Sequence, residues 1–212
     1  MKTYDLITAI SADAKSTRPP ITSVVWLAAG AGVIAAAMLF FLILQPRPNI
    51  AEAITEPSFL YKWVLTLTLL ASALVLVMQL ARPQPLSRNG LLLLLAPVGV
   101  LALGVAYELL TLPSSDWMPT LIGNSATACM TYIPILSALP LAALLLALRQ
   151  GAPSRPTLTG AVAGLAATGI GATLYASHCT NDSPLFMAAW YVAGAAIMAV
   201  AGALLGARLL RW

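Results

Sequence analysis

The chain has 212 residues, of which 60% are hydrophobic and only 8% are charged, whereas roughly 25% of the residues in an ordinary soluble domain are charged. This composition excludes a water-soluble globular protein, and the apolar runs along most of the length exclude a disordered or collagen-like chain. The sequence therefore predicts an all-α, polytopic membrane protein.

The first predicted element is a polar and mixed segment, residues 1–21, that precedes the first apolar run. Several of its apolar side chains fall on one face of a helix that Pro19 and Pro20 end. A helix lying on lipid usually carries many Lys and Arg residues on its polar face, but acidic and basic residues are mixed here. This favours a helix that docks in a groove of a soluble partner. The expected partner-binding residues are Asp5, Leu6, Ile7, Ile10, Asp13 and Ala14.

Residues 22–212 are predicted to form a bundle of six transmembrane helices. About 20 predominantly apolar residues cross the hydrocarbon core as a helix, and six stretches qualify. The fourth is too long for one straight span and contains Pro134 and Pro140, so we expect a short interfacial segment before it or a kinked helix. The predicted spans are approximately 23–44, 63–81, 90–110, 121–148, 158–177 and 185–205.

The predicted loops and tails divide the basic residues unequally between the two sides of the membrane. One side collects nine of the 11 Lys and Arg residues, and the other has only Arg47 and Lys62. Because cytoplasmic loops carry the excess of basic residues, we expect both termini to be cytoplasmic. This rule accounts for the formal net charge of +4, so the basic balance does not indicate direct nucleic-acid binding.

Side chains suited to catalysis or ion transport are scarce in the predicted bundle. Glu108 and Gln79 lie near the ends of their spans, whereas a carrier usually needs polar groups near the midplane. The sequence also lacks HExxH, CxxC, GxSxG and a phosphate-binding glycine loop. We therefore expect neither an enzyme nor a bound cofactor. A small-molecule or metal permease and a purely structural membrane subunit remain open as alternatives.

Two GxxxG motifs occur in the last two predicted spans, at Gly160 and Gly164 and at Gly202 and Gly206. Glycine at this spacing allows helix backbones to approach closely in lipid. We expect these motifs to be packing surfaces within the bundle.

The two cysteines, Cys129 and Cys179, are both predicted on the extracytoplasmic side, near the ends of consecutive helices. In an oxidising compartment they could form a structural disulfide. Alternatively, they could act as a redox or stress sensor, in which His178 and Asp182 lower the thiol pKa or complete a metal site. The possible metal ligands are then Cys129, Cys179, His178 and Asp182, although a structural or regulatory pairing is favoured over a permanent metal site.

Several stretches of the sequence carry a family resemblance over almost the whole length. They are MKTYDLITAISADA, SFLYKWVLTLTLLA before LARP, CMTYIPILSALPLAALLLALRQGAPSRPTLTGAVAGL, LYASHCTNDSPLFMAAWY and the closing LLGARLLRW. On these stretches the chain resembles the NrsF-like negative regulators of extracytoplasmic-function sigma factor F, which are six-span proteins of the bacterial inner membrane.

The resemblance implies a membrane anti-sigma factor. Its amino-terminal segment would hold an extracytoplasmic-function sigma factor at the cytoplasmic face. Cys129 and Cys179, on the other face, would report heavy-metal or oxidant stress and so release the sigma factor. The sigma factor as partner comes from the resemblance alone, whereas the residues themselves indicate a partner-sized helix and an outer thiol pair.

Overall fold

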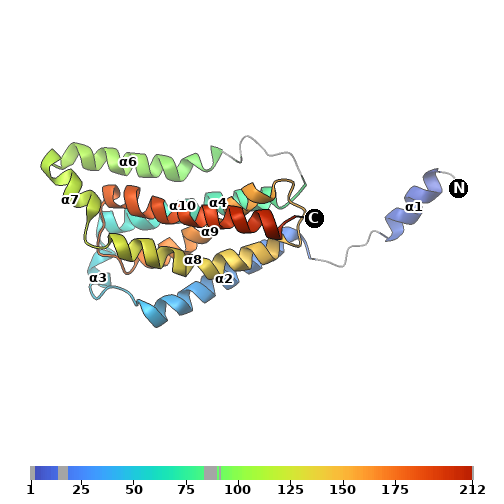
Figure 1. The fold of residues 1–212 in the computed structure, drawn as a ribbon, viewed down its shortest axis with the longest axis horizontal. Helices are drawn as coiled ribbons and strands as arrows, with labels where there is room; N and C mark the ends of the chain where they lie inside the picture. The colour runs from blue at the N-terminus through green and yellow to red at the C-terminus, as the bar shows by residue number, and fades with distance from the viewer. Residues whose placement is uncertain (1–2, 14–18, 84–89, 91, 212) are drawn as a thin grey trace.

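The computed structural model of the chain describes residues 3–13, 19–83, 90 and 92–211. Throughout this described part the regular elements are helices and none is a strand, so the all-α prediction is confirmed (Figure 1). The helices are α1 (Thr3–Asp13), α2 (Ile21–Ile43), α3 (Ile50–Ala53), α4 (Pro57–Leu80), α6 (Leu95–Thr111), the 3-10 helix η1 (Ser114–Asp116), α7 (Trp117–Ile122), α8 (Ala126–Leu148), α9 (Pro156–Ala176) and α10 (Pro184–Leu209).

Five of the described helices are long and apolar enough to cross a membrane. They are α2, α4, α8, α9 and α10, which have between 21 and 26 residues each. They correspond to five of the six predicted spans. The remaining prediction, 90–110, overlaps the shorter apolar helix α6, which has 17 residues. At 1.5 Å per residue α6 is about 25 Å long, somewhat less than the hydrocarbon core of roughly 30 Å. Six spans therefore remain a prediction.

Proline marks the start of several of these helices. The first position of α4, α9 and α10 is occupied by Pro57, Pro156 and Pro184. A backbone N–H at this position has no hydrogen-bond partner within the helix, so its absence in proline costs nothing. Pro97 lies in the first turn of α6. Proline is tolerated in a first turn, so the position of Pro97 is compatible with the start of α6 at Leu95.

The long fourth apolar run is divided into two helices, in line with the expected short segment before the span. The helix α7 ends before Gly123, whose φ of 58° lies in the left-handed region that favours glycine. The span itself, α8, begins at Ala126 and continues as helix through Pro134 and Pro140. The break therefore falls at Gly123 and not at either proline.

The helix α9 is the central element of the bundle. It packs against α10, α4 and α8, which surround it in Figure 1, and most of its residues are buried. Its sequence is rich in glycine and alanine, whose small size lets neighbouring helix backbones approach closely.

The two GxxxG motifs face each other across the contact between α9 and α10, which confirms that they are packing surfaces within the bundle. A Cβ atom added at Gly160 would collide with the carbonyl oxygen of Gly202, and one added at Gly202 would collide with that of Gly160. A Cβ atom at Gly206 would lie 2.8 Å from the Cα atom of Gly160. These are backbone atoms, which cannot move aside as a flexible side chain would.

We expect Gly202→Ala to lower the thermal unfolding midpoint of the purified protein in detergent. The added methyl group forces α9 and α10 apart, and overpacking of this kind costs about 1–3 kcal/mol. The matched control is Gly30→Ala in α2, where an added Cβ has no described atom within 4 Å. That variant should keep or slightly raise the midpoint, because alanine favours helix by about 1 kcal/mol over glycine. Equal midpoints for the two variants would contradict the close contact.

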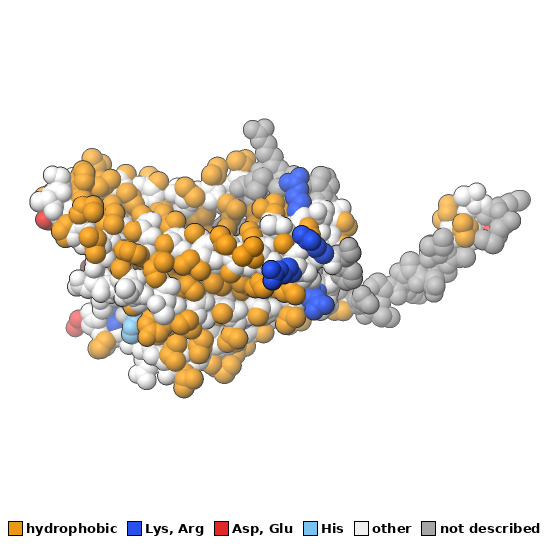
Figure 2. Space-filling view, in the orientation of Figure 1, with side chains coloured by type: hydrophobic (Ala, Val, Ile, Leu, Met, Phe, Trp, Pro, Cys, Tyr) orange, Lys and Arg blue, Asp and Glu red, His pale blue; other side chains and the backbone are white. Residues whose placement is uncertain are grey.

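Charged side chains are separated between the two ends of the bundle (Figure 2). The basic end holds the carboxyl ends of α4, α8 and α10 and the amino ends of α2 and α9, whereas acidic side chains and the histidine lie at the opposite, acidic end. A hydrogen bond from the Arg82 guanidinium to Thr22 Oγ1, at 2.9 Å, joins α4 to α2 at the basic end. The described basic residues there are Arg82, Arg149, Arg155, Arg208 and Arg211.

Candidate functional site

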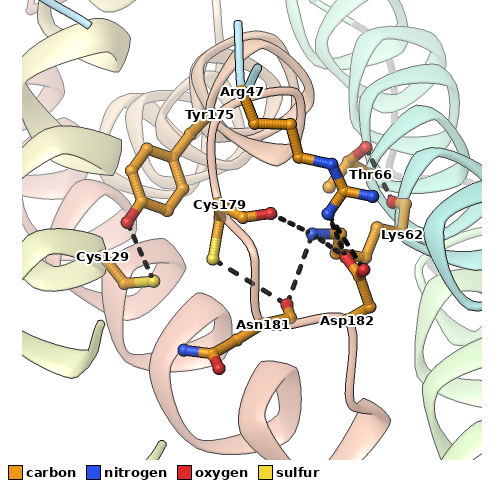
Figure 3. Close-up of polar contacts among 8 residues, drawn as sticks. All are labelled: Arg47, Lys62, Thr66, Cys129, Tyr175, Cys179, Asn181 and Asp182. Atoms are coloured by element: carbon orange, nitrogen blue, oxygen red, sulfur yellow. Dashed lines mark hydrogen bonds and ion pairs between the residues drawn. The ribbon is translucent and has the colours of Figure 1, made fainter. Parts of the chain in front are cut away.

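The two cysteines lie together at the acidic end of the bundle, in one buried cluster (Figure 3). Cys129 belongs to the first turn of α8, and Cys179 lies in the segment between α9 and α10. Both are buried free thiols. Cys129 Sγ donates a hydrogen bond to Tyr175 Oη, at 3.4 Å, and Cys179 Sγ lies 3.8 Å from the carbonyl oxygen of Asn181. The structure thus brings the two cysteines into one buried cluster as free thiols.

Aromatic side chains enclose the thiol pair. The ring of Tyr175 is buried and stacks on Tyr132, with ring centroids 6.4 Å apart, and its centroid lies 6.1 Å from that of Tyr191. Phe186 and Met187, from the first turn of α10, complete the same buried cluster. Sequence reasoning did not single out Tyr175, although the spacing of Tyr175 and Cys179, four residues apart, would have indicated neighbours at a helix end.

A buried ion cluster lies beside Cys179 and holds the segment between α9 and α10. Lys62 of α4 forms a salt bridge with Asp182, and Arg47, from the loop before α3, bonds the same carboxylate at 3.0 and 3.4 Å. Lys62 also donates to the carbonyl oxygens of Cys179, at 2.8 Å, and Asn181, at 3.3 Å. Both cations lie over the ring of Phe59, a favourable cation–π arrangement.

These surroundings make the Cys179 thiol more acidic than an ordinary cysteine thiol. Its pKa is lowered to about 6, chiefly because Cys129 donates a hydrogen bond to it, with a further contribution from the positive charge of Lys62; burial of the thiol opposes the effect. A thiol with such a pKa is largely thiolate at neutral pH, and the thiolate is the form that attacks oxidants and binds soft metals. The arrangement is therefore suited to thiol chemistry at Cys179.

The four possible metal ligands are not assembled as a metal site. Among the described residues, no group of three or more His, Cys, Asp or Glu side chains is placed to hold a metal ion. The Asp182 carboxylate is occupied by Lys62 and Arg47, and His178 Nδ1 bonds the carbonyl oxygen of Gln45 at 2.8 Å. Of the predicted set, the two cysteines share one buried cluster.

Glu108 connects α6 to the same segment. Its Oε2 atom accepts hydrogen bonds from Ser183 Oγ, at 2.8 Å, and from the backbone N–H of Leu185, at 2.7 Å, in the first turn of α10. A carboxylate is favourable at a helix amino terminus, where unpaired N–H groups and the helix dipole are positive. Glu108 therefore joins α6 to the amino terminus of α10 through two hydrogen bonds to one carboxylate oxygen.

Sequence reasoning missed the ion cluster as part of the site, although one signal could have found it. Arg47 and Lys62 are the two basic residues on the predicted extracytoplasmic side, where the charge rule expects few of them. Basic residues that occur on that side despite the rule are candidates for an ion pair with one of the few acidic residues predicted there.

Comparisons with known proteins identify the family. The family model described as "NrsF: Negative regulator of sigma F" matches residues 10–212. The chain belongs to this family. It is 37% identical over 215 residues to the "Anti-sigma-F factor NrsF" of Caulobacter vibrioides, and 34% identical over 217 residues to the "Probable anti-sigma-F factor NrsF" of Azospira oryzae, with both chains covered completely in each case. No solved structure matches the chain.

The amino-terminal helix of this NrsF-family chain lies apart from the bundle in Figure 1. It exposes apolar side chains, with Leu6 44% and Ile7 60% exposed, and Asp5 lies in its first turn. Ile10 and Asp13 fall within the bounds of α1, whereas Ala14 lies outside the described residues. The helix thus presents at least part of the apolar face that the sequence predicts.

Proposed function

We propose that this chain is a membrane-embedded anti-sigma factor of the bacterial inner membrane. Residues 1–21 form a cytoplasmic segment that sequesters an extracytoplasmic-function sigma factor, and residues 22–212 form a six-helix transmembrane bundle. Heavy-metal or oxidative stress, sensed at Cys129 and Cys179 on the extracytoplasmic side, releases the sigma factor. The observation that carries the proposal is the full-length match to two relatives that are named as anti-sigma-F factors.

The exposed apolar side chains of α1 support its role as the binding element. A helix of 11 residues is too short to bury a core of its own, yet it exposes Tyr4, Leu6 and Ile7. Such a helix gains stability by laying its apolar face in a groove of a partner. A sigma factor held in this way is kept at the membrane and away from the transcription machinery.

The interior of the bundle supports a regulatory protein over a permease. A cavity of about 270 Å³ lies among α4, α6, α9 and α10, and its described lining contains aliphatic side chains and three hydroxyl groups but no charged residue. A carrier usually needs polar or ionisable groups at the midplane to bind its substrate. The charged residues of the described bundle gather instead at its two ends (Figure 2).

The thiol pair supports the sensing part of the proposal. Cys179 combines a lowered pKa with a second thiol, that of Cys129, in the same buried cluster. Two such thiols can be oxidised to a disulfide, or can share a soft metal ion as thiolates. Either event changes the contacts of the segment that Lys62, Arg47 and Glu108 hold, and so reaches α4 and α6.

A pull-down from detergent-solubilised membranes tests the function. The full-length chain should recover a sigma factor, identified by mass spectrometry, and a variant that lacks residues 2–20 should recover none while still inserting in the membrane. Recovery that is independent of residues 2–20 would remove this segment as the binding element, and recovery of no sigma factor by the full-length chain would contradict the proposed class and favour a permease or a structural subunit.

The path of the chain supports counting α6 as the sixth span. The helix α4 ends at the basic end, where the Ala152 N–H bonds the carbonyl oxygen of Ala81 at 3.3 Å, whereas α8 begins at the acidic end beside Cys179. The chain between them must run the length of the bundle, and α6 lies along it in Figure 1. Its length of about 25 Å requires the bilayer to thin slightly around it, at a modest cost.

Reporter fusions test this topology. We expect fusions after Gly151 and at the carboxyl terminus to read as cytoplasmic, because both follow the basic end of the bundle. A fusion after Ser115 should read as extracytoplasmic. Alkaline phosphatase and green fluorescent protein give opposite readings at each position and so control for expression. An inverted pattern would place the cysteines in a reducing compartment and contradict the sensing proposal.

A further inference from the structure

The ion cluster beside Cys179 contains more buried positive than negative charge. Lys62 is fully buried and Arg47 is only 5% exposed. Among the described residues, these two cations form salt bridges with a single carboxylate, that of Asp182. The Nε atom of Arg47 is also buried without a hydrogen-bond partner in the described part of the chain. Because an unpaired buried charge is costly, this cluster favours a further negative group nearby.

Cys179 lies beside this cluster. Figure 3 shows its sulfur on one side of the segment and the Lys62 ammonium close to the same backbone, where it bonds the carbonyl oxygen of Cys179.

Lys62 also fixes the backbone on which Cys179 lies. Its ammonium group contacts three of the four successive residues of this stretch: the carbonyl oxygens of Cys179 and Asn181 and the carboxylate of Asp182. The Cys179 thiol itself lies 3.8 Å from the carbonyl oxygen of Asn181. One side chain from α4 thereby sets the position of a segment that is more than 115 residues away in the sequence.

We propose that Lys62 is the positioning residue of the thiol pair: it fixes residues 179–182, and with them the Cys179 thiol, in the buried cluster that also holds Cys129. The sensing role of the pair rests on the function proposed above, whereas its positioning by Lys62 does not. Arg47 assists by holding the second side of the Asp182 carboxylate.

The rate of disulfide formation between the two cysteines tests this proposal in the purified full-length protein. The oxidant is diamide, which takes up two electrons and two protons and becomes a hydrazine, while the two thiols lose them and form one S–S bond. Mass spectrometry of the linked peptides measures the product, and Cys129→Ser, which cannot form it, gives the background. The reaction requires no sigma factor.

We expect Lys62→Met to slow disulfide formation about tenfold at neutral pH, since a charge-assisted hydrogen bond contributes about 1.5–3 kcal/mol and 1.4 kcal/mol corresponds to tenfold. Lys62→Arg keeps the cation and should restore most of the rate. The matched control is Arg82→Met, which removes a cation at the opposite end of the bundle and should leave the rate unchanged.

A Lys62→Met variant that reacts at the original rate would overturn the proposal. So would a variant that reacts faster and has a lower unfolding midpoint, because this result shows that Lys62 only closes the structure around the thiols. A slowed reaction in vitro, with a normal sigma response to oxidant in cells, would instead contradict the proposed sensing function and leave the positioning role intact.

Discussion

Leu6→Asp is expected to abolish sigma-factor binding while membrane insertion stays intact. Leu6 lies on the exposed apolar face of α1, and a carboxylate placed there would lose its water in an apolar groove without gaining a counter-charge. The expected phenotype in cells is constitutive expression of the sigma regulon. Ile10→Asp should act in the same way, because residue 10 follows residue 6 by one helical turn.

Thr8→Asp is the matched control for this experiment. It adds the same charge to the same helix, but Thr8 is exposed and is separated from Leu6 and Ile10 by about 200° around the helix axis. Membrane pull-downs of the three variants should show binding for Thr8→Asp only. Full binding by both apolar-face variants would remove α1 as the docking element and direct attention to the loops at the basic end.

Most of the fold follows from patterns that are local in the sequence. Runs of about 20 apolar residues predicted five of the observed long helices because an apolar segment in lipid must satisfy its own backbone hydrogen bonds, as a helix does. The helices α9 and α10 begin at Pro156 and Pro184, close to the predicted starts at residues 158 and 185. The GxxxG motifs predicted close packing because their effect depends on the absence of side-chain atoms, a property that is visible in the sequence itself.

The length of α6 could not be predicted in this way. The residues before Leu95 are as apolar as those that follow, so hydropathy alone extends the span to residue 90. The helix α6 nevertheless begins at Leu95, with Pro97 in its first turn, a position where proline is tolerated. Hydropathy measures compatibility with lipid and does not specify where a helix begins.

The ion cluster is also beyond local patterns. Lys62 and Asp182 are 120 positions apart in the sequence, and their contact depends on how α4 packs against α9. The sequence placed both residues on the same side of the membrane, together with Arg47, but could not place them side by side. The same limit applies to Tyr175, which meets Cys129 of another helix. These contacts are products of tertiary packing.

The cysteine substitutions are expected to have the second large effect. Cys129→Ser and Cys179→Ser should each abolish most of the release of the sigma factor that oxidant or soft-metal stress induces. Serine keeps a small polar group in the cluster but supplies no thiolate, so each variant removes the chemistry that the pair performs together. A reporter gene of the sigma regulon measures the response, and Thr131→Ser on an exposed position of α8 controls for expression.

The double substitution distinguishes a shared thiol site from two separate ones. Because Cys129 and Cys179 lie in one buried cluster, we expect them to act as one unit, and residues that share one interaction are not additive. The stress response of the double variant should therefore match that of either single variant to within about twofold, which is the precision with which such effects are compared. If the pair only stabilises the bundle, the single variants should instead lower the unfolding midpoint and leave the stress response largely unchanged. Additive losses of signalling in the double variant would contradict a common site and assign the two cysteines separate roles.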